Sequence, residues 1–189
     1  MLLKGKTAVV TGCLQGIGRE TLDTFARNGA NVFACCLNET DEFLNHILSL
    51  EQNHGVQIIP IYFDLLDTDS IKQAAQKIQK QKLPIDILVN IAGLTQDALF
   101  SMVSMDQMQK VFQANFFSQI MFSQYIVKLM LRNNGGSIIN ISSISAIDGN
   151  AGQLTYSSTK AAIIAATKTM SIELASISSA VVTHVRCVV

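Results

Sequence analysis

Six short apolar segments alternate along this chain with segments of helical periodicity. Each apolar segment is a continuous run rather than an apolar–polar alternation, which is typical of strands covered on both faces. Strands and helices in alternation predict an α/β fold, with a doubly wound parallel sheet, right-handed crossovers and helices on either side. The expected strands are Thr7–Thr11, Asn31–Cys36, Gln57–Tyr62, Ile85–Asn90, Ser137–Ser142 and Val181–Val189.

The segments between these strands carry helix start and stop signals. Thr40 is suited to cap the second expected helix, and Gly55 lies just past its end. Ser104 followed by Gln107 forms a capping-box pattern before the longest helical segment. The expected helices are Ile17–Asn28, the segment from Thr40 toward Asn53, Asp67–Gln81, one long helix over Met105–Arg132, and Thr155–Ser176.

Length and composition indicate a single globular domain over residues 1–189. Hydrophobic residues make up 49% of the chain, enough for a sizeable core, and charged residues only 15%, which excludes a disordered chain. The net charge is zero, without a basic stripe for nucleic acid or an anionic membrane. Met1–Lys6 is too short and too early-charged for a secretory signal, and no stretch approaches the ~18 apolar residues of a membrane span. We therefore expect a cytoplasmic protein with neither nucleic-acid nor membrane partners.

The four cysteines show no metal-binding or redox pattern. They are Cys13, Cys35, Cys36 and Cys187, and none belongs to a C-x-x-C pair. Adjacent cysteines are poor disulfide partners, so we expect reduced, mostly buried thiols and no metal site.

The segment TGCLQGIG, residues 11–18, follows the first expected strand and opens the first expected helix. Glycine permits a positive φ and close approach of a phosphate, and a helix N-terminus offers unpaired N–H groups to an anion. Parallel sheets bind ligands beyond the carboxyl ends of their strands, where this loop lies. Its G-x3-G-x-G spacing differs from the common G-x-G-x-x-G pattern, so the loop alone leaves a simple tight turn open while favouring a dinucleotide site.

The end of the second expected strand bears on the choice of dinucleotide. An NAD site places an acid about 20 residues after the glycines to bind the ribose, whereas this strand ends on Cys36 and Glu39 comes three residues later. Gln15 and Leu37 are uncharged, so neither side chain can form an ion pair with a 2′-phosphate. Because a carboxylate would repel that phosphate, its absence favours NADP(H) over NAD(H).

A proton-transfer site is predicted further along the chain. Tyr156 and Lys160 are four positions apart in the last expected helix and share one of its faces. A neighbouring ammonium group lowers the pKa of a phenol from its usual ~10, and a serine hydroxyl such as that of Ser143, thirteen residues earlier, can hydrogen-bond a reacting carbonyl. Taken alone, the Tyr–Lys pair is more often a surface pair and Ser143 a turn residue; their order after the glycine loop favours the catalytic interpretation.

In this order the motifs resemble those of the short-chain dehydrogenase/reductase family, from Lys6 to about Ala175. The resemblance implies a Rossmann-like, three-layer α/β/α fold and a nicotinamide dinucleotide cofactor. Asp64-Leu65 matches the acid that the family places near the adenine, and Asn90-Ile91-Ala92-Gly93 matches its N-N-A-G segment with Ile91 in place of the second asparagine. The cofactor contacts that it implies are Gly12, Leu14, Gln15, Gly16, Ile17, Gly18, Asp64, Leu65, Asn90, Ala92, Gly93, Tyr156 and Lys160.

The same resemblance implies a catalytic tetrad of Asn115, Ser143, Tyr156 and Lys160. Tyr156 would protonate the carbonyl oxygen as hydride arrives from the nicotinamide, and Ser143 would position and polarise that carbonyl. Lys160 would lower the pKa of Tyr156 and bind the ribose hydroxyls, while Asn115 would hold a water that links Lys160 to solvent. The expected reaction is therefore reduction of a ketone to a secondary alcohol.

Within the family, residues 93–99 resemble the G-x-T-x-D-x-L segment of the 3-oxoacyl-(acyl-carrier-protein) reductases of fatty acid biosynthesis, through Gly93, Thr95, Asp97 and Leu99. Those reductases carry basic residues for an acidic carrier near the ends of two helices. Here only Lys128 and Arg132 are basic in that region, which disfavours carrier docking. Another carbonyl or alcohol substrate stays open.

The family normally continues past the sixth strand with a Pro-Gly turn, a substrate-covering lid and a seventh strand, whereas this sequence ends at Val189. We expect the lid and last strand to be missing and one sheet edge to be open. The alternative function is therefore that of a truncated product or pseudoenzyme that binds nucleotide or partners without efficient catalysis.

The resemblance also implies a homotetramer or homodimer that associates through the two longest expected helices. Their apolar surface extends beyond one stripe, and a helix that is apolar all round must be covered. The residues that carry this excess are Phe112, Phe116, Phe117, Ile120 and Tyr125.

Overall fold

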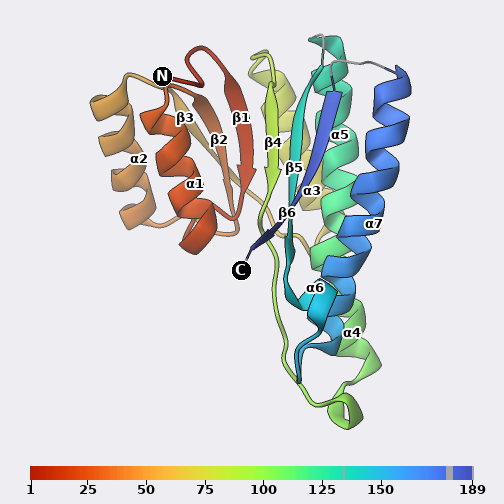
Figure 1. The fold of residues 1–189 in the computed structure, drawn as a ribbon. Coiled ribbons are helices and arrows are strands. Elements are labelled where there is room, and N and C mark those ends of the chain that lie inside the picture. The colour runs from red at the N-terminus through yellow and green to blue at the C-terminus, as the bar shows by residue number, and fades with distance from the viewer. Residues whose placement is uncertain (134, 178–180, 189) are drawn as a thin grey trace.

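The computed structural model describes residues 1–133, 135–177 and 181–188. A single six-stranded sheet runs through the molecule, with helices on its two faces (Figure 1). Its elements are β1 (Thr7–Thr11), α1 (Gly16–Arg27), β2 (Asn31–Cys36), α2 (Asp41–His54), β3 (Ile58–Tyr62), α3 (Thr68–Lys80), β4 (Ile87–Asn90), the short 3-10 turn η1 (Phe100–Met102), α4 (Met105–Phe112), the π-helical turn η2 (Gln113–Phe117), α5 (Ser118–Arg132), β5 (Gly136–Ser143), α6 (Ser145–Asp148), α7 (Leu154–Ile177) and β6 (Val181–Val188).

The strands are all parallel and lie in the order β3-β2-β1-β4-β5-β6. The chain crosses from the β3 edge back over β1 to place β4 beside it, so the strand order reverses between β1 and β4. Ligands of doubly wound sheets bind beyond the carboxyl ends of the strands at this reversal. The predicted fold class is confirmed, and the strands at β1 and β2 have the predicted bounds.

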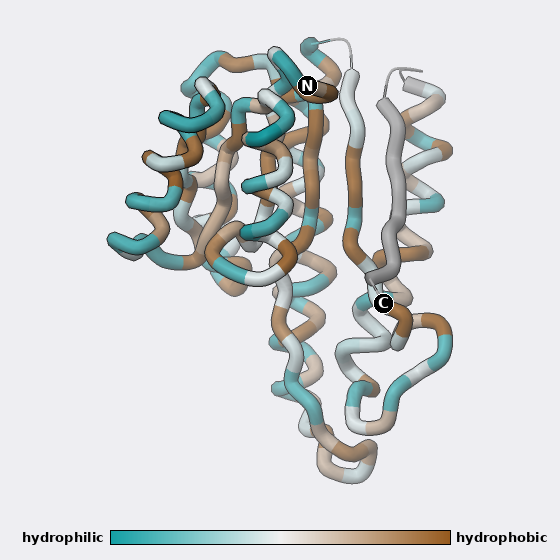
Figure 2. Tube along the Cα trace, turned by 60° about the vertical axis from the view of Figure 1, so that its left-hand side comes forward, coloured by the Kyte–Doolittle hydropathy of each residue, from teal (hydrophilic) through white to brown (hydrophobic). Residues whose placement is uncertain are grey.

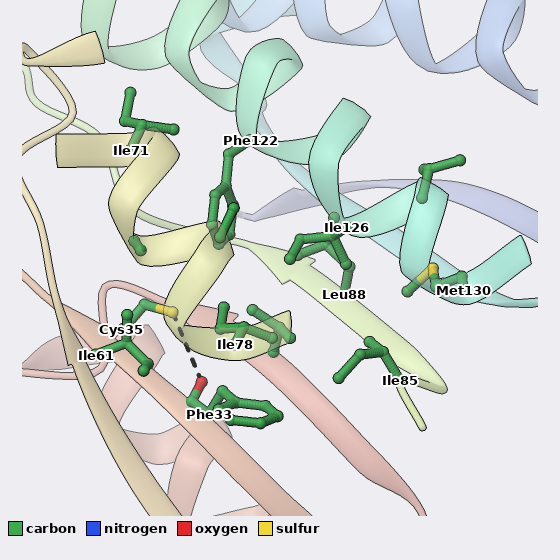
Figure 3. Close-up of a cluster of buried hydrophobic side chains, with 14 of the residues drawn as sticks. Phe33, Cys35, Ile61, Ile71, Ile78, Ile85, Leu88, Phe122, Ile126 and Met130 are labelled. Atoms are coloured by element: carbon green, nitrogen blue, oxygen red, sulfur yellow. Dashed lines mark hydrogen bonds between the residues drawn. The ribbon is translucent and has the colours of Figure 1, made fainter. Parts of the chain in front are cut away.

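One face of the sheet is covered by α3, α5 and α7. Strand residues such as Phe33, Ile61 and Leu88 pack there against Ile78 of α3 and Phe122 of α5 (Figure 3). These side chains are almost completely buried, and each contributes about 1.5–3 kcal/mol to folding when taken out of water.

The opposite face carries α1 and α2, which pack on β1, β2 and β3 through a second buried cluster. Leu22 of α1 and Phe43 of α2 contact strand residues such as Val10 and Val32. Hydrophobic residues run along the strands, whereas the helices carry hydrophilic residues at intervals along their length (Figure 2). In the described residues, no helix is long and apolar enough to cross a membrane.

Helix ends follow the sequence signals closely. The Thr40 side chain accepts a hydrogen bond from the Phe43 N–H at the start of α2, and Gly55 ends that helix in the left-handed conformation with φ +64°. At α4, the Ser104 side chain accepts from the Gln107 N–H, which is one half of the predicted capping box.

The prediction of a single long helix over Met105–Arg132 is wrong in one detail. A π-helical turn at Gln113–Phe117 separates α4 from α5. A π turn accommodates an extra residue within a continuous helix and often occurs at functional sites. Apolar periodicity does not reveal it, because the side chains on either side remain on roughly the same face.

The expectation that every strand is covered on both faces is also wrong for β5, whose burial alternates along the strand. Ile138, Asn140 and Ser142 are buried beneath α5 and α7, whereas Ile139 and Ile141 are half-buried on the other face. The reason is that α1 and α2 lie over β1–β3, and none of the described helices covers β5 on that side.

Candidate active site

A cavity of about 480 Å³ opens at the carboxyl ends of β1 and β4, where the strand order reverses. It is bounded by the glycine loop, by the ends of β2 and β3 and by the segment after β4. Ten of the residues predicted to bind the cofactor line it: Gly12, Leu14, Gln15, Gly16, Ile17, Gly18, Asp64, Leu65, Ala92 and Gly93.

The glycine loop requires glycine for two separate reasons. Gly12 and Gly16 have φ values of +79° and +56°, a conformation that residues with a side chain rarely adopt. Gly18 has an ordinary conformation, but a Cβ atom there would overlap the Gly12 carbonyl oxygen. A Cβ on Gly12 would also lie 3.1 Å from the Ala92 Cα, so the loop packs directly on the segment after β4.

The N-terminus of α1 faces the same loop without a side-chain cap. Gln15 occupies the cap position and makes no side-chain hydrogen bond to the helix, and the first turn contains no acidic residue. By contrast, α2 and α3 are capped by Thr40 and Asp67 and carry acids in their first turns. The free N–H groups, the close backbone approach and the cavity together fit the pyrophosphate of a dinucleotide.

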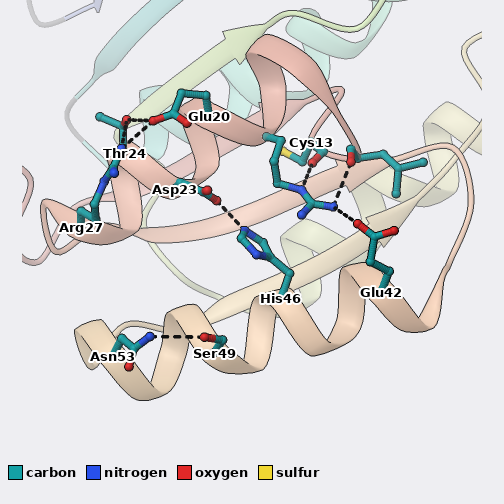
Figure 4. A network of polar contacts seen from close by, with 11 residues as sticks. Cys13, Glu20, Asp23, Thr24, Arg27, Glu42, His46, Ser49 and Asn53 are labelled. Atoms are coloured by element: carbon teal, nitrogen blue, oxygen red, sulfur yellow. Dashed lines mark hydrogen bonds and ion pairs between the residues drawn. The ribbon is translucent and has the colours of Figure 1, made fainter.

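Arg19, in the first turn of α1, braces this loop and was missed by the sequence reasoning. Its Nε donates to the Cys13 carbonyl at 3.3 Å and its Nη2 to the Leu14 carbonyl at 3.0 Å. The guanidinium lies over the Phe43 ring, 5.1 Å from its centroid, and 4.0 Å from Glu42. Glu42 lies in a network of polar contacts between α1 and α2 that includes the His46–Asp23 pair (Figure 4). The one available signal was a basic residue directly after the third glycine.

Thr11 joins the ends of β1 and β4. Its hydroxyl oxygen accepts hydrogen bonds from the N–H groups of Ile91 and Ala92, at 2.9 and 3.0 Å. This contact holds the two strand ends that form opposite sides of the cavity.

The cysteines near the cavity are neutral thiols. Cys13, Cys35 and Cys36 are buried and free, and burial is the largest cause that raises the pKa of each, to about 12 for Cys36. The prediction of buried thiols is confirmed for these three, and the Cys187 side chain lies outside the described part of the structure. Within that part, no group of three or more His, Cys, Asp or Glu side chains is placed to hold a metal ion.

The Asn90 side chain points away from the cavity into a buried polar network. Its amide donates to the Asn140 side-chain oxygen at 2.8 Å and to the Ser123 hydroxyl at 2.9 Å. Asn140 donates in turn to the Thr167 hydroxyl at 2.9 Å. The network ties β4 and β5 to α5 and α7, and a cofactor contact by Asn90 stays a prediction.

Lys160 and Tyr156 lie together on α7, as their spacing predicted. The Lys160 ammonium is 5.7 Å from the centroid of the Tyr156 ring and donates to the Ile141 carbonyl of β5 at 2.8 Å. Lys160 is only 2% exposed, and burial lowers its pKa from 10.5 to about 8. Because the Tyr156 ring is half-buried, the pair is not the solvated surface pair that its spacing alone allowed.

Ser143 is the last residue of β5 and is half-buried. Its hydroxyl oxygen lies 3.2 Å from the Ser145 nitrogen and 2.9 Å from the Ser145 hydroxyl oxygen. The neighbouring Ser142 hydroxyl donates to the Lys160 carbonyl at 2.9 Å, which ties the end of β5 to α7.

Asn115 lies in the π turn and is completely buried. Its side-chain oxygen accepts from the Leu94 N–H, and its amide donates to the Leu94 carbonyl, both at 2.8 Å. The amide also reaches the Thr159 hydroxyl of α7 at 3.2 Å. Asn115 therefore links the segment after β4 to α7, and its predicted role in holding a water stays a prediction.

Replacing Lys160 with methionine is expected to stabilise the protein at neutral pH. With the folded pKa near 8 and the unfolded pKa near 10.5, burial of the ammonium costs about 3 kcal/mol below pH 8. The cost disappears as pH rises from 8 to 10.5, because the unfolded state then still binds the proton that the folded state has released. Urea unfolding should show that Lys160→Met raises the free energy of unfolding by about 2–3 kcal/mol at pH 7 and far less at pH 10.

The matched control is Lys168→Met, at an exposed position of the same helix. It should change the free energy of unfolding by less than about 0.5 kcal/mol at both pH values. An equal effect of Lys160→Met at pH 7 and pH 10 would contradict the buried-ammonium assignment.

The fold and this site define the class of protein: a doubly wound α/β protein with a cavity at the carboxyl ends of its strands, and with a serine, a tyrosine and a buried lysine grouped at the end of β5 and on α7. Ser143, Tyr156 and Lys160 are not among the residues that line that cavity. Residues 6–187 match the family model described as short chain dehydrogenase. The chain therefore belongs to the short-chain dehydrogenase/reductase family of oxidoreductases, and the predicted family is confirmed.

Several relatives agree with this assignment. The 3-oxoacyl-(acyl-carrier-protein) reductase of Thermotoga maritima is 35% identical over 175 residues, 93% of this chain and 70% of that protein. Nodulation protein G of Azospirillum brasilense is 35% identical over 170 residues, 90% of this chain and 69% of that protein. Among solved structures, L-sorbose reductase of Gluconobacter frateurii, complexed with NADPH and L-sorbose, superposes with a TM-score of 0.87 at 25% identity, covering 92% of this chain and 66% of that one. The chain thus spans about two-thirds of the length of these relatives.

Proposed function

We propose that this chain reduces a ketone to a secondary alcohol with NADPH, and that its substrate is a 3-oxoacyl thioester. The observation that carries the proposal is the buried Lys160 ammonium beside the Tyr156 ring, on the helix that packs against the strand ending in Ser143. This arrangement places an acid, a cation and a hydroxyl donor at the carboxyl ends of the strands, where the dinucleotide cavity also opens.

The glycine loop and the free N-terminus of α1 would hold the pyrophosphate, and Asp64 and Leu65 would lie toward the adenine. When bound, the nicotinamide supplies the hydride that reaches the carbonyl carbon. The fit rests on the cavity that this loop lines and on the α1 N-terminus, which has no side-chain cap and no acidic residue in its first turn.

The proton for the carbonyl oxygen comes from Tyr156. A hydroxyl proton is transferred more readily when the resulting phenolate is stabilised, and the Lys160 ammonium lies where it can do so. Ser143 donates a hydrogen bond to the same carbonyl oxygen, where negative charge develops as the reaction proceeds.

Lys160 also connects this chemistry to the sheet. Its ammonium is held by the Ile141 carbonyl, and its own carbonyl accepts from the Ser142 hydroxyl. These two contacts fix the cation relative to Ser143, the next residue along β5.

The preference for NADPH rests on charge at the end of β2. Cys36 and Leu37 line the cavity there in place of a carboxylate, so nothing at these positions repels a 2′-phosphate. Burial raises the pKa of Cys36, and the positive charge of the Arg19 guanidinium opposes part of that rise. Arg19 would therefore favour an added phosphate at this strand end, although Glu42 lies 4.0 Å from the same guanidinium.

The substrate class rests on the segment after β4 and on the relatives. Asp97 accepts from the Thr95 hydroxyl at 2.5 Å and from the Gln153 amide at 3.4 Å, three residues before Tyr156. The Ala98 N–H donates to the Gly152 carbonyl at 2.8 Å. The motif shared with the 3-oxoacyl reductases thus borders the approach to Tyr156, where it can select the substrate.

The acyl group would be presented by a small thioester rather than by a docked carrier protein. Lys128 and Arg132, both exposed on α5, are the two basic residues in that region that could bind an acidic carrier protein.

We also propose an even-numbered homo-oligomer, a homotetramer or homodimer, that covers α4, α5 and α7. Phe117, exposed in the described chain, is one apolar side chain that such an interface would bury.

The test is reduction of acetoacetyl-CoA followed at 340 nm with NADPH and NADH in parallel. We expect saturable turnover and a kcat/KM at least about tenfold higher with NADPH, since one favourable charged contact is worth about 1.5 kcal/mol or more. Nucleotide binding without reduction of acetoacetyl-CoA or of other ketones and sugars would overturn the reductase proposal and favour a nucleotide-binding protein. Turnover of other ketones alone would overturn only the substrate class.

Two variants at one exposed position locate the 2′-phosphate. Leu37 is 56% exposed and lines the cavity, so charge can be added there with little effect on folding. Leu37→Arg should strengthen NADPH binding relative to NADH, and Leu37→Asp should weaken it, each by about tenfold. Equal responses of the two dinucleotides would contradict the placement of the phosphate at this strand end.

A further inference from the structure

We propose that Ser145 is a positioning residue that holds the Ser143 hydroxyl as a hydrogen-bond donor toward the substrate carbonyl. The inference rests on the proposed ketone reduction and extends it to a residue outside the predicted tetrad. Ser145 opens α6, two residues after the end of β5, and its own side chain is only 5% exposed.

The geometry assigns both contacts of Ser145 to one atom, the Ser143 hydroxyl oxygen. The Ser145 N–H approaches that oxygen at 3.2 Å and the Ser145 hydroxyl at 2.9 Å. The backbone N–H can act only as a donor, so Ser143 is the acceptor in at least this contact.

The second contact decides what the Ser143 proton can do. A serine hydroxyl has one proton to donate and two lone pairs to accept with. When Ser145 donates through both its N–H and its hydroxyl, both lone pairs of Ser143 are used, and the Ser143 proton is free for the carbonyl oxygen. A hydroxyl that already accepts hydrogen bonds is also polarised into a stronger donor.

The Ser145 hydroxyl has no other assignment in the described chain. It does not cap α6, whose N-cap residue Ile144 makes no side-chain bond to the helix. The Ser145 backbone carbonyl accepts from the Gly149 N–H, which closes the helix turn without the side chain. The Ser145 side chain is thus a buried donor whose acceptor in the described chain is the Ser143 hydroxyl oxygen.

The test compares Ser145→Val with Ser145→Thr, which have nearly the same shape and differ in the hydroxyl. With NADPH and a ketone that the wild-type protein reduces, Ser145→Val should lower kcat about tenfold with KM changed less than about twofold. Ser145→Thr should keep kcat within about threefold of wild type. The NADPH dissociation constant, measured by fluorescence, should stay within about twofold in both variants.

A double-mutant cycle with Ser143→Ala separates positioning from a structural role. If Ser145 acts through Ser143, Ser145→Val should change kcat less than about twofold once Ser143 is alanine. A tenfold loss in both backgrounds, or equal losses in the threonine and valine variants, would overturn the positioning role. If the wild-type protein reduces no ketone, the reductase proposal fails and the positioning role fails with it; wild-type turnover with an undiminished Ser145→Val variant overturns the positioning role alone.

Discussion

Tyr156→Phe is expected to lower kcat for ketone reduction by about 10³-fold or more, with the NADPH dissociation constant unchanged within about twofold. The substitution removes one hydroxyl and keeps the ring that lies beside Lys160. General acid catalysis by a positioned side chain contributes about 10²–10⁴-fold, and here the phenol is the group placed to protonate the carbonyl oxygen. Steady-state kinetics with NADPH and fluorescence titration of the nucleotide measure the two quantities separately.

The chain contains a matched control for this variant. Tyr125 of α5 also has a lysine over its ring, with the Lys128 ammonium 5.8 Å from the centroid, but it lies on another helix and packs against the hydrophobic core. Tyr125→Phe should leave kcat within about twofold. Near-normal turnover in Tyr156→Phe would show that another group supplies the proton and would remove the basis of the proposed reaction.

The second large effect is expected for Gly18→Ala. The added methyl group would overlap the Gly12 carbonyl oxygen, which is backbone and cannot rotate away as a flexible side chain could. The loop would have to open at the point where it approaches the pyrophosphate, so NADPH affinity should fall at least about 100-fold, or about 2.7 kcal/mol. Isothermal calorimetry measures the affinity, and urea unfolding measures the accompanying loss of stability.

Gly55→Ala is the control for a loss of stability away from the loop. Unlike Gly18, Gly55 has a positive φ, +64°, and nothing lies within 4 Å of its added Cβ atom; it ends α2, far along the chain from the loop. This variant should lose about 1 kcal/mol of stability from backbone strain and bind NADPH as the wild type does. Wild-type NADPH affinity in Gly18→Ala would mean that the dinucleotide does not use this loop.

The strands were well predicted because each is a short apolar run bounded by polar or glycine residues. Continuous apolar runs indicate strands that are buried on both faces, and α/β proteins bury the central strands of their sheets in this way. The helix caps at Thr40 and Ser104 were predicted for a similar reason, since the side chain that caps a helix is adjacent to it in sequence.

The features that were missed depend on contacts made when the chain folds, either within the loop or between distant segments. The bonds of Arg19 to the loop carbonyls follow from how the loop folds back on the first turn of α1. The π turn at Asn115 accompanies contacts with Leu94 and Thr159, which come from two other segments. Apart from the basic residue directly after the third glycine, nothing in the local pattern around these residues distinguishes them from an ordinary helix surface or interior.

The sequence by itself determined the order of strands and helices, the glycine loop at the switch point and the shared face of Tyr156 and Lys160. These follow from local periodicity and from spacing along a helix, which can be read from the sequence without knowing how its segments pack together. Only the tertiary structure decided that Lys160 is buried against Ile141 and that Asn90 turns into the core. The physical reason is that solvation and hydrogen-bond partners are set by whichever segments pack around a side chain, and these are brought together only by the complete sheet and its helices.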